Sequence, residues 1–179
     1  MTTLKALTNH NHEVAENQPF TKLLLSGNIP ENIYADFLYN QHAIYKTLET
    51  VAESRGLLNG LQGIERNQKI QLDYENLPKC KTIVYPSTQK YIQYITTRNL
   101  TDNQILAHLY VRHMGDLYGG QMIKRVVPGT TTMYEFENRK ELIDALRQKL
   151  DVSMAAEANE CFIFAIELFT ELANEHNIQ

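Results

Sequence analysis

Hydrophobic residues recur every three or four positions along most of the 179-residue chain, which is the spacing of one helix face. The sequence shows neither a convincing strand-like alternation nor an internal repeat. We therefore expect an all-α, single-domain, multi-helix bundle over residues 1–179. The spacing predicts helices over residues 3–17, 20–25, 30–55, 88–99, 139–150 and 154–176, with a further helix over 61–73 in the least regular segment, 57–86.

Local signals mark where several of these helices begin and end. Pro30 can open the long helix and Gly56 can follow its end. Thr101 and Gln104 have the spacing of a capping box, and the helix that they open runs to the stop at Pro128-Gly129. Other candidate N-caps are Ser87, Asn138 and Ser153. The last helix is expected to turn four large apolar residues inward, namely Phe162, Ile166, Phe169 and Leu172.

The helix that begins after Thr101 contains three glycines, each of which costs about 1 kcal/mol relative to alanine in a helix interior. Gly115 and Gly119 are four residues apart and share one face, with Arg112 and Asp116 in the neighbouring row. This predicts a bare ledge edged by one cation and one carboxylate. Two interpretations remain open from spacing alone: a tight crossing with another helix, or close approach of a flat ligand.

Composition limits the class of partner. The net charge of −4, without a dominant basic stripe, argues against nonspecific nucleic-acid binding. Cys80 and Cys161 are far apart and form no zinc-type spacing, so a reducing, cytoplasmic location is expected. The N-terminus lacks a signal-peptide apolar segment, and there is no run of about 18 apolar residues, so no membrane span is expected.

Several common chemistries lack their motifs in this sequence. It contains no Glu-x-x-His pair for a di-iron bundle, no His-Glu-x-x-His for a zinc hydrolase, no Walker loop and no Gly-x-Ser-x-Gly elbow. The remaining features are a histidine on the first helix, His12, and the glycine-bearing helix. That combination suits a flat macrocycle held between two helices, with its iron ligated by one imidazole.

Three segments carry a resemblance to a known family. Residues 112–121, with the pattern Arg-x-x-Gly-Asp-Leu-x-Gly-Gly-Gln, look like the distal-helix signature of heme oxygenases. Residues 12–17 resemble the proximal-histidine segment of that family, and residues 141–172 resemble its last two helices. The resemblance implies a fold in which heme is sandwiched between a proximal helix and a glycine-bent distal helix.

The resemblance also implies a role for individual residues. His12 matches the proximal iron ligand, and Glu16, one turn on, is placed to hold its ring. Gly115 and Gly119 match the distal glycines over the heme, and Asp116 matches the aspartate that orders distal water and relays protons to O2. The other matched positions are Arg112 in the distal hydrogen-bond network, Gly120 beside the heme, and Lys5, Tyr110 and Arg147 at the heme propionates.

The implied reaction is oxidation of heme to biliverdin, CO and ferrous iron, with cleavage expected at the α-meso carbon. Electrons must come from outside because no flavin or iron–sulfur motif is present, and reduced ferredoxin is the expected donor. An acidic ferredoxin would dock on the basic residues Lys5, Lys124, Arg125, Arg147 and Lys149.

The chain lacks the C-terminal membrane anchor of animal members, so we expect a soluble bacterial, cyanobacterial or phage-type enzyme, with a bilin reductase as a downstream partner.

The sequence departs from the family pattern at a few positions. Tyr118 stands where the signature usually has a small residue such as serine, and His113-Met114 replaces the commoner Tyr-Leu, which we interpret as a packing change. His42 lies near where many members carry a distal tyrosine, and it is either part of the proton network or a partly exposed histidine. Of the remaining histidines, we expect His108 to be structural and His10 and His176 to face solvent.

Two other functions remain open. A heme-binding or heme-storage bundle would keep His12 and the glycine ledge but would not need Asp116. A helical-bundle enzyme acting on a thiamin-like heterocycle would make the Gly-Asp-Leu-x-Gly-Gly run a coincidence.

Overall fold

The computed structural model describes residues 3–78 and 83–179, and within these ranges the regular structure is entirely helical. This confirms the predicted fold class. The helices are α1 Leu4–Glu16, α2 Pro19–Leu25, α3 Glu31–Ser54, α4 Asn67–Glu75, α5 Pro86–Thr97, α6 Asp102–Tyr118, α7 Gly120–Ile123, α8 Arg139–Gln148 and α9 Ala155–Glu175, with short 3-10 turns η1 Thr132–Tyr134 and η2 Val152–Met154.

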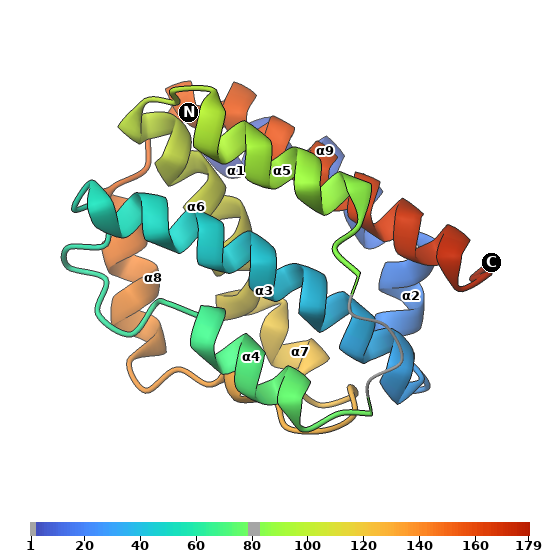
Figure 1. Cartoon of the computed structure of the whole chain (residues 1–179). Helices are drawn as coiled ribbons and strands as arrows, with labels where there is room; N and C mark the ends of the chain where they lie inside the picture. Colours follow the sequence, from blue (N-terminus) through green and yellow to red (C-terminus); the bar gives the residue numbers. More distant parts are fainter. Residues whose placement is uncertain (1–2, 79–82) are drawn as a thin grey trace.

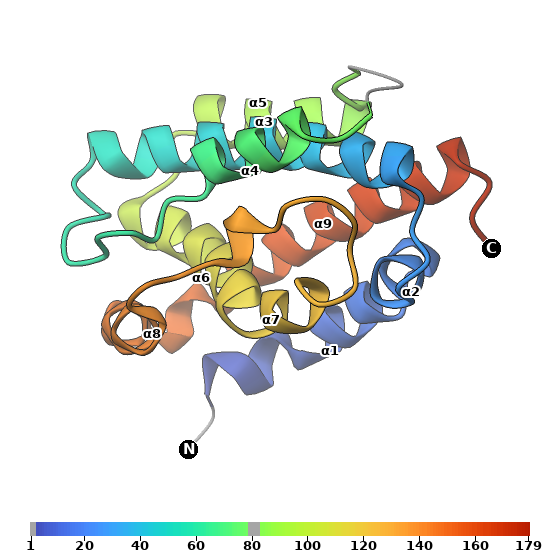
Figure 2. The ribbon, with the colours of Figure 1, turned by 90° about the horizontal axis from the view of Figure 1, so that it is seen from below.

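The helices lie in layers, which Figure 2 shows from the edge. Helices α3, α4 and α5 form one side, α1, α7 and α8 form the other, and α6 and α9 run between them. In Figure 1 the two longest helices, α3 and α9, are seen on either side of α5. Both α1 and α6 pack on α9, so α9 supports the two helices on which the candidate site residues lie.

The helix ends follow local chemistry. Thr101 and Gln104 form the complete capping box at the start of α6, as the sequence predicts. Gly56 adopts a φ of +69° immediately after α3, a conformation that glycine reaches without steric penalty. Helix α5 begins at Pro86 instead of being capped by Ser87, because proline suits the first turn, where its missing N–H is not needed.

Two expected helices are placed differently. The helix predicted over 61–73 begins only at Asn67, because Gly60 and Gly63 take positive φ values of +80° and +86° that end helical geometry. The turns they make surround Arg66, whose fully buried guanidinium donates to backbone carbonyl groups. At the start of the last helix, Asp151 caps the preceding 3-10 turn, in place of the expected cap by Ser153.

The inward face of α9 differs from the prediction. Only Leu172 of the four expected residues is fully buried, and the buried row is Ala158, Cys161, Phe164, Leu168 and Leu172. The other three are half-buried because α9 is covered from several sides. Phe162 meets α1 through His12, and Phe169 meets α2 and α3 through Phe20 and Phe37. Cys80 lies outside the described residues.

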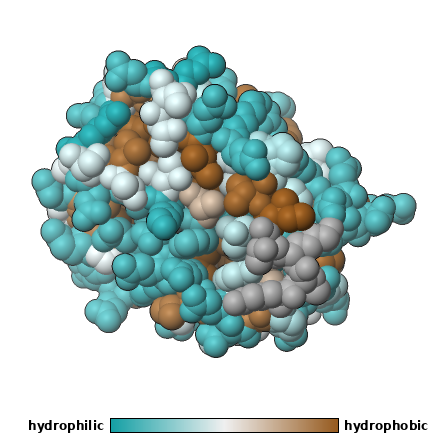
Figure 3. Space-filling view, in the orientation of Figure 1, coloured by the Kyte–Doolittle hydropathy of each residue, from teal (hydrophilic) through white to brown (hydrophobic). Residues whose placement is uncertain are grey.

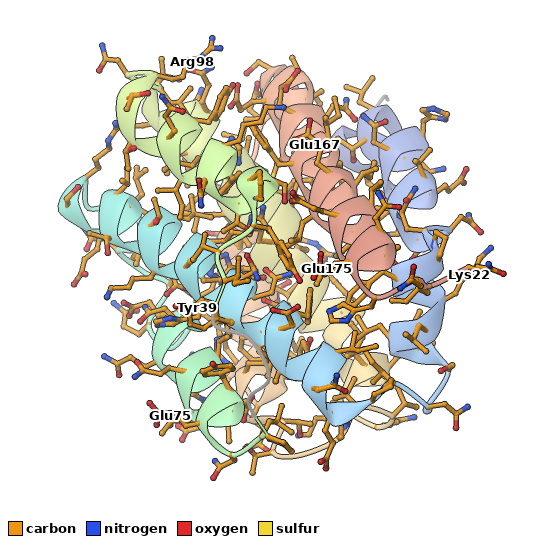
Figure 4. The ribbon with its side chains drawn as sticks, turned by 45° about the vertical axis from the view of Figure 1, so that its right-hand side comes forward. Lys22, Tyr39, Glu75, Arg98, Glu167 and Glu175 are labelled. Atoms are coloured by element: carbon orange, nitrogen blue, oxygen red, sulfur yellow. The ribbon has the colours of Figure 1, made fainter. Side chains whose placement is uncertain are left out.

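The surface is mainly polar. On the face drawn in Figure 3, hydrophilic residues predominate, and the hydrophobic ones gather mostly in the seam between α3 and α5. Charged side chains project from the outer faces of the helices, among them Lys22, Glu75, Arg98 and Glu167 (Figure 4). Within the described residues, no helix is both long and apolar enough to cross a membrane.

Candidate active site

The glycines of α6 leave one face of the helix bare. A Cβ atom added at Gly115 would meet nothing within 4 Å, and one added at Gly119 would meet only the carbonyl oxygen of Gly115 in its own helix, at 3.3 Å. Both glycines are exposed. A tight helix crossing would place a neighbouring backbone within this distance, so the structure favours the other interpretation, an open face for a flat ligand.

Gly120 differs from the other two glycines of the signature. It is buried at the start of α7, and an added Cβ would lie 2.5 Å from Cδ1 of Tyr134. Its small size is therefore needed where α7 meets η1, and both of these elements also contact α6.

The structure does not place Arg112 and Asp116 at the edge of the ledge, where their positions on a helical wheel predict them. Both side chains point into the protein, with relative exposures of 7% and 8%. The guanidinium of Arg112 lies over the ring of Tyr91 of α5, with its central carbon 4.3 Å from the ring centroid. Both residues lie on the inward side of α6, which packs on α3 and α9.

Asp116 is held in a buried polar environment. The hydroxyl group of Tyr45 on α3 donates a hydrogen bond to its Oδ2 at 2.7 Å. Burial raises the pKa of Asp116 to about 6, and nearby His113, the Tyr45 hydrogen bond and Arg66 oppose that rise. A carboxyl group with this pKa exchanges its proton near neutral pH, which an ordinary aspartate does not.

A second pair of groups supports this region from α3. Nε2 of His113 lies 2.8 Å from Oε1 of the buried Glu49, which also accepts from the backbone N–H of Arg66 and the side chain of Asn67. Burial acts to raise the pKa of Glu49, but the hydrogen bonds and the nearby His113 outweigh it, so the pKa lies below its usual value. The ring of His113 also packs against that of Tyr45, with 5.1 Å between centroids, and so adjoins the partner of Asp116.

His12 lies on α1, the other helix of the candidate site. Its side chain is 50% exposed, and its ring meets the edge of Phe162 on α9 at 5.7 Å between centroids. Nε2 of His12 is 3.6 Å from Oε1 of Glu16, which is longer than a hydrogen bond. The carboxylate therefore lies beside the ring without forming a hydrogen bond to it. An exposed imidazole on one helix and a bare glycine face on another fit a planar iron macrocycle.

Comparison with known proteins decides the family. The family model described as heme oxygenase matches residues 1–171. The chain belongs to the heme oxygenase family. It is 30% identical to the heme oxygenase of Guillardia theta and 28% identical to that of Porphyra purpurea; each match covers 94% of this chain and 84% of the relative.

Solved structures share this fold. Heme oxygenase-1 from Synechocystis sp. PCC6803 in complex with heme superimposes with a TM-score of 0.79, 23% identity, and coverage of 96% of this chain and 91% of that chain. Heme oxygenase from Leptospira interrogans gives 0.77 and 25%, covering 94% of this chain and 97% of that chain. Family membership confirms the resemblance seen in the sequence, and it identifies heme oxygenation as the reaction and heme as the cofactor.

The residues expected at the propionates come from three different helices. Lys5 is exposed on α1 and Tyr110 is half-buried on α6. Arg147 is exposed on α8, where its Nη2 donates to the hydroxyl oxygen of Tyr118 at 2.6 Å. A hollow of about 620 Å³ opens at another place, between residues 62–69 and 135–138, where the Arg66 guanidinium is already bonded to carbonyl groups.

The histidines fall into two groups. His108 is fully buried, with Nε2 2.8 Å from Oε1 of Glu157 and Nδ1 3.1 Å from the Tyr91 hydroxyl, which fits the structural interpretation. His10 is exposed, as expected. The expectation for His176 is wrong: its side chain is only 13% exposed and its Nε2 lies 2.8 Å from Oδ2 of Asp36.

The hydrogen-bond partner of Asp116 is the functional residue that the sequence reasoning missed. His42 is half-buried, and burial lowers its pKa, but the hydrogen bond to Asp116 comes from Tyr45, one turn further along α3. The only available signal was the position of Tyr45 in the same helix. Which of two aromatic residues three positions apart meets α6 depends on the rotation of α3, and the sequence does not specify that rotation.

Proposed function

We propose that this chain cleaves heme at the α-meso carbon to biliverdin, CO and ferrous iron, using O2 and electrons from reduced ferredoxin. Asp116 is the observation that supports this proposal most strongly. It directly follows Gly115 in α6, its inward-pointing carboxylate accepts from Tyr45, and its pKa is about 6. A heme-storage bundle has no use for a buried carboxyl group that exchanges protons near neutral pH.

Five residues of this chain would hold and orient the cofactor. His12 would present a neutral imidazole nitrogen to the iron from α1, and Glu16 would orient the ring. Lys5 and Arg147 are exposed cations on α1 and α8, and we assign them to the propionates, whose pairing sets how the heme is rotated about its iron axis. Tyr110 is the proposed uncharged partner of a propionate.

The distal helix would supply space and protons. Gly115 and Gly119 leave room above the macrocycle where any side chain would intrude. Asp116 and the Tyr45 hydroxyl would hold a water and pass protons to the ledge, with Arg112 and Gly120 supporting the helix from behind. Heme itself supplies the iron that binds O2 and the ring that is oxidised, while the protein sets orientation and protons.

The electron donor is proposed from charge. An acidic ferredoxin would dock on Lys5, Lys124, Arg125, Arg147 and Lys149. Two of these cations have partners in the free protein, since Lys124 lies 3.4 Å from Glu135 and Arg147 bonds to Tyr118. We further propose that the enzyme acts in the cytoplasm and that its biliverdin passes to a bilin reductase for pigment synthesis.

One experiment tests the reaction. The protein is reconstituted with hemin, supplied with reduced ferredoxin and O2, and followed by its visible spectrum and by separation of the biliverdin isomers. Loss of the Soret band with growth of α-biliverdin is the expected result. A Soret band that no electron donor bleaches would instead indicate storage, and turnover with another donor but not ferredoxin would refute the donor assignment alone.

A further inference from the structure

Tyr118, which departs from the family signature, occupies a defined place in the structure. It is the last residue of α6, directly before Gly119, and is 44% exposed. Two guanidinium groups from α8 approach its ring, that of Arg139 at 5.7 Å and that of Arg147 at 5.8 Å from the centroid. The ring therefore joins the end of the glycine ledge to α8 through cation–π contacts.

The hydroxyl group adds a directed contact. It accepts a hydrogen bond from Nη2 of Arg147 at 2.6 Å, and a hydroxyl that accepts in this way still has its own hydrogen to donate. A guanidinium carries five N–H groups, so Arg147 also keeps donors for another acceptor. Tyr118 and Arg147 thus present two adjacent sets of donors, which suits the two oxygens of a carboxylate.

The other charges around Arg147 leave it available. Asp144 Oδ1 is 4.0 Å from Arg147 Nη1, but both side chains are more than half exposed, so water and salt weaken this pair. Arg139 also approaches the ring, and its Nε donates to the carbonyl oxygen of Leu117, which holds it against the end of α6. Arg147 is the guanidinium that bonds to the Tyr118 hydroxyl, so it is the cation held beside that hydroxyl.

We propose that Tyr118 is a positioning residue that orders Arg147 and, together with it, binds one propionate of heme. This rests on the proposed function. A long exposed arginine samples many rotamers, and binding a carboxylate must restrict them. The ring and hydroxyl of Tyr118 restrict Arg147 beforehand, and they sit at the end of the ledge itself. Tyr118 therefore narrows the rotation of heme about its iron axis and with it the choice of meso carbon.

Binding of two porphyrins tests the proposal without requiring turnover. Hemin and hemin dimethyl ester, which lacks free carboxylates, are titrated into the wild type, Tyr118→Phe and Arg147→Lys. The wild type should prefer hemin, and each variant should lose roughly 10-fold or more of that preference, the size expected for a hydrogen bond to a charged group. The biliverdin isomer composition should also change from one isomer to a mixture in Tyr118→Phe.

Tyr39→Phe is the matched control. Tyr39, labelled in Figure 4, lies on α3 and packs its ring against Tyr74 at 5.3 Å, so its hydroxyl can be removed without touching α6 or α8. The control should match the wild type in both measurements. If Tyr118→Phe also matches the wild type, the role of Tyr118 is refuted while the proposed function stands. If the wild type fails to bind hemin, both proposals are refuted.

Discussion

Replacing Gly115 by alanine should make the protein more stable and reduce its enzymatic activity. The added methyl group meets no atom within 4 Å, so the substitution introduces no clash. It removes a glycine from the interior of α6, which is worth about 1 kcal/mol of helix propensity. For a chain of this size that corresponds to a rise in Tm of about 2–4 °C. The same methyl group occupies the bare face proposed to lie over heme, so biliverdin formation should fall.

Gly120→Ala provides the opposite case within the same signature. Its added Cβ would lie 2.5 Å from Cδ1 of Tyr134, which is too close for any side-chain contact. Tyr134 is only 2% exposed and has little room to move. Overpacking of this kind costs about 1–3 kcal/mol, more than the gain in helix propensity, so the net effect is a lower Tm.

Thermal unfolding followed by far-ultraviolet circular dichroism measures both stabilities, and hemin turnover by the same preparations measures activity. We expect the two variants to differ in opposite directions from the wild type: Gly115→Ala should be more stable and less active, whereas Gly120→Ala should be less stable. A loss of stability in Gly115→Ala would show that its surroundings are not open. Full turnover in a stabilised Gly115→Ala would show that the bare face does not lie over the reacting heme.

Four further substitutions test individual residues. Asp116→Asn should raise the free energy of unfolding at neutral pH by up to about 3 kcal/mol and abolish biliverdin formation. The pKa of Asp116 rises from 3.8 to about 6 on folding, so the wild-type carboxyl group stabilises the fold below pH 3.8, and this stabilisation is lost as the pH rises through about 6. Urea unfolding at several pH values should show this fall in the free energy of unfolding in the wild type but not in Asp116→Asn. Tyr45→Phe should raise the pKa of Asp116 further and move the acid limb of the pH–rate profile upward; an unmoved limb contradicts the contact. Glu49→Gln should lower the free energy of unfolding by about 1–3 kcal/mol at neutral pH, with little effect at acid pH, because the lowered pKa of Glu49 makes its contribution present above 4.5 and lost below it. His12→Ala should lose the imidazole-ligated hemin spectrum, and an unchanged spectrum would assign the ligand to His10.

The helices themselves could largely be predicted from neighbouring residues. The first helix is expected over 3–17 and spans Leu4–Glu16, and the capping box at Thr101 is formed as written in the sequence. These features depend on contacts within one or two helical turns. Residues 61–66 were wrongly predicted as helical, because Gly60 and Gly63 favour turns that wrap around Arg66, whose acceptors include Met133.

The sequence by itself determined the family, the all-helical class and the bare face of the glycine helix, because glycine spacing and helix periodicity are local properties. Only the tertiary structure decided that Asp116 points inward to Tyr45, 71 residues earlier, and that Gly120 packs on Tyr134. It also decided that Tyr118 meets Arg147 of α8. The physical reason is the same in each case: periodicity gives the faces of a helix, but the neighbours that cover each face are set by how distant helices rotate and pack.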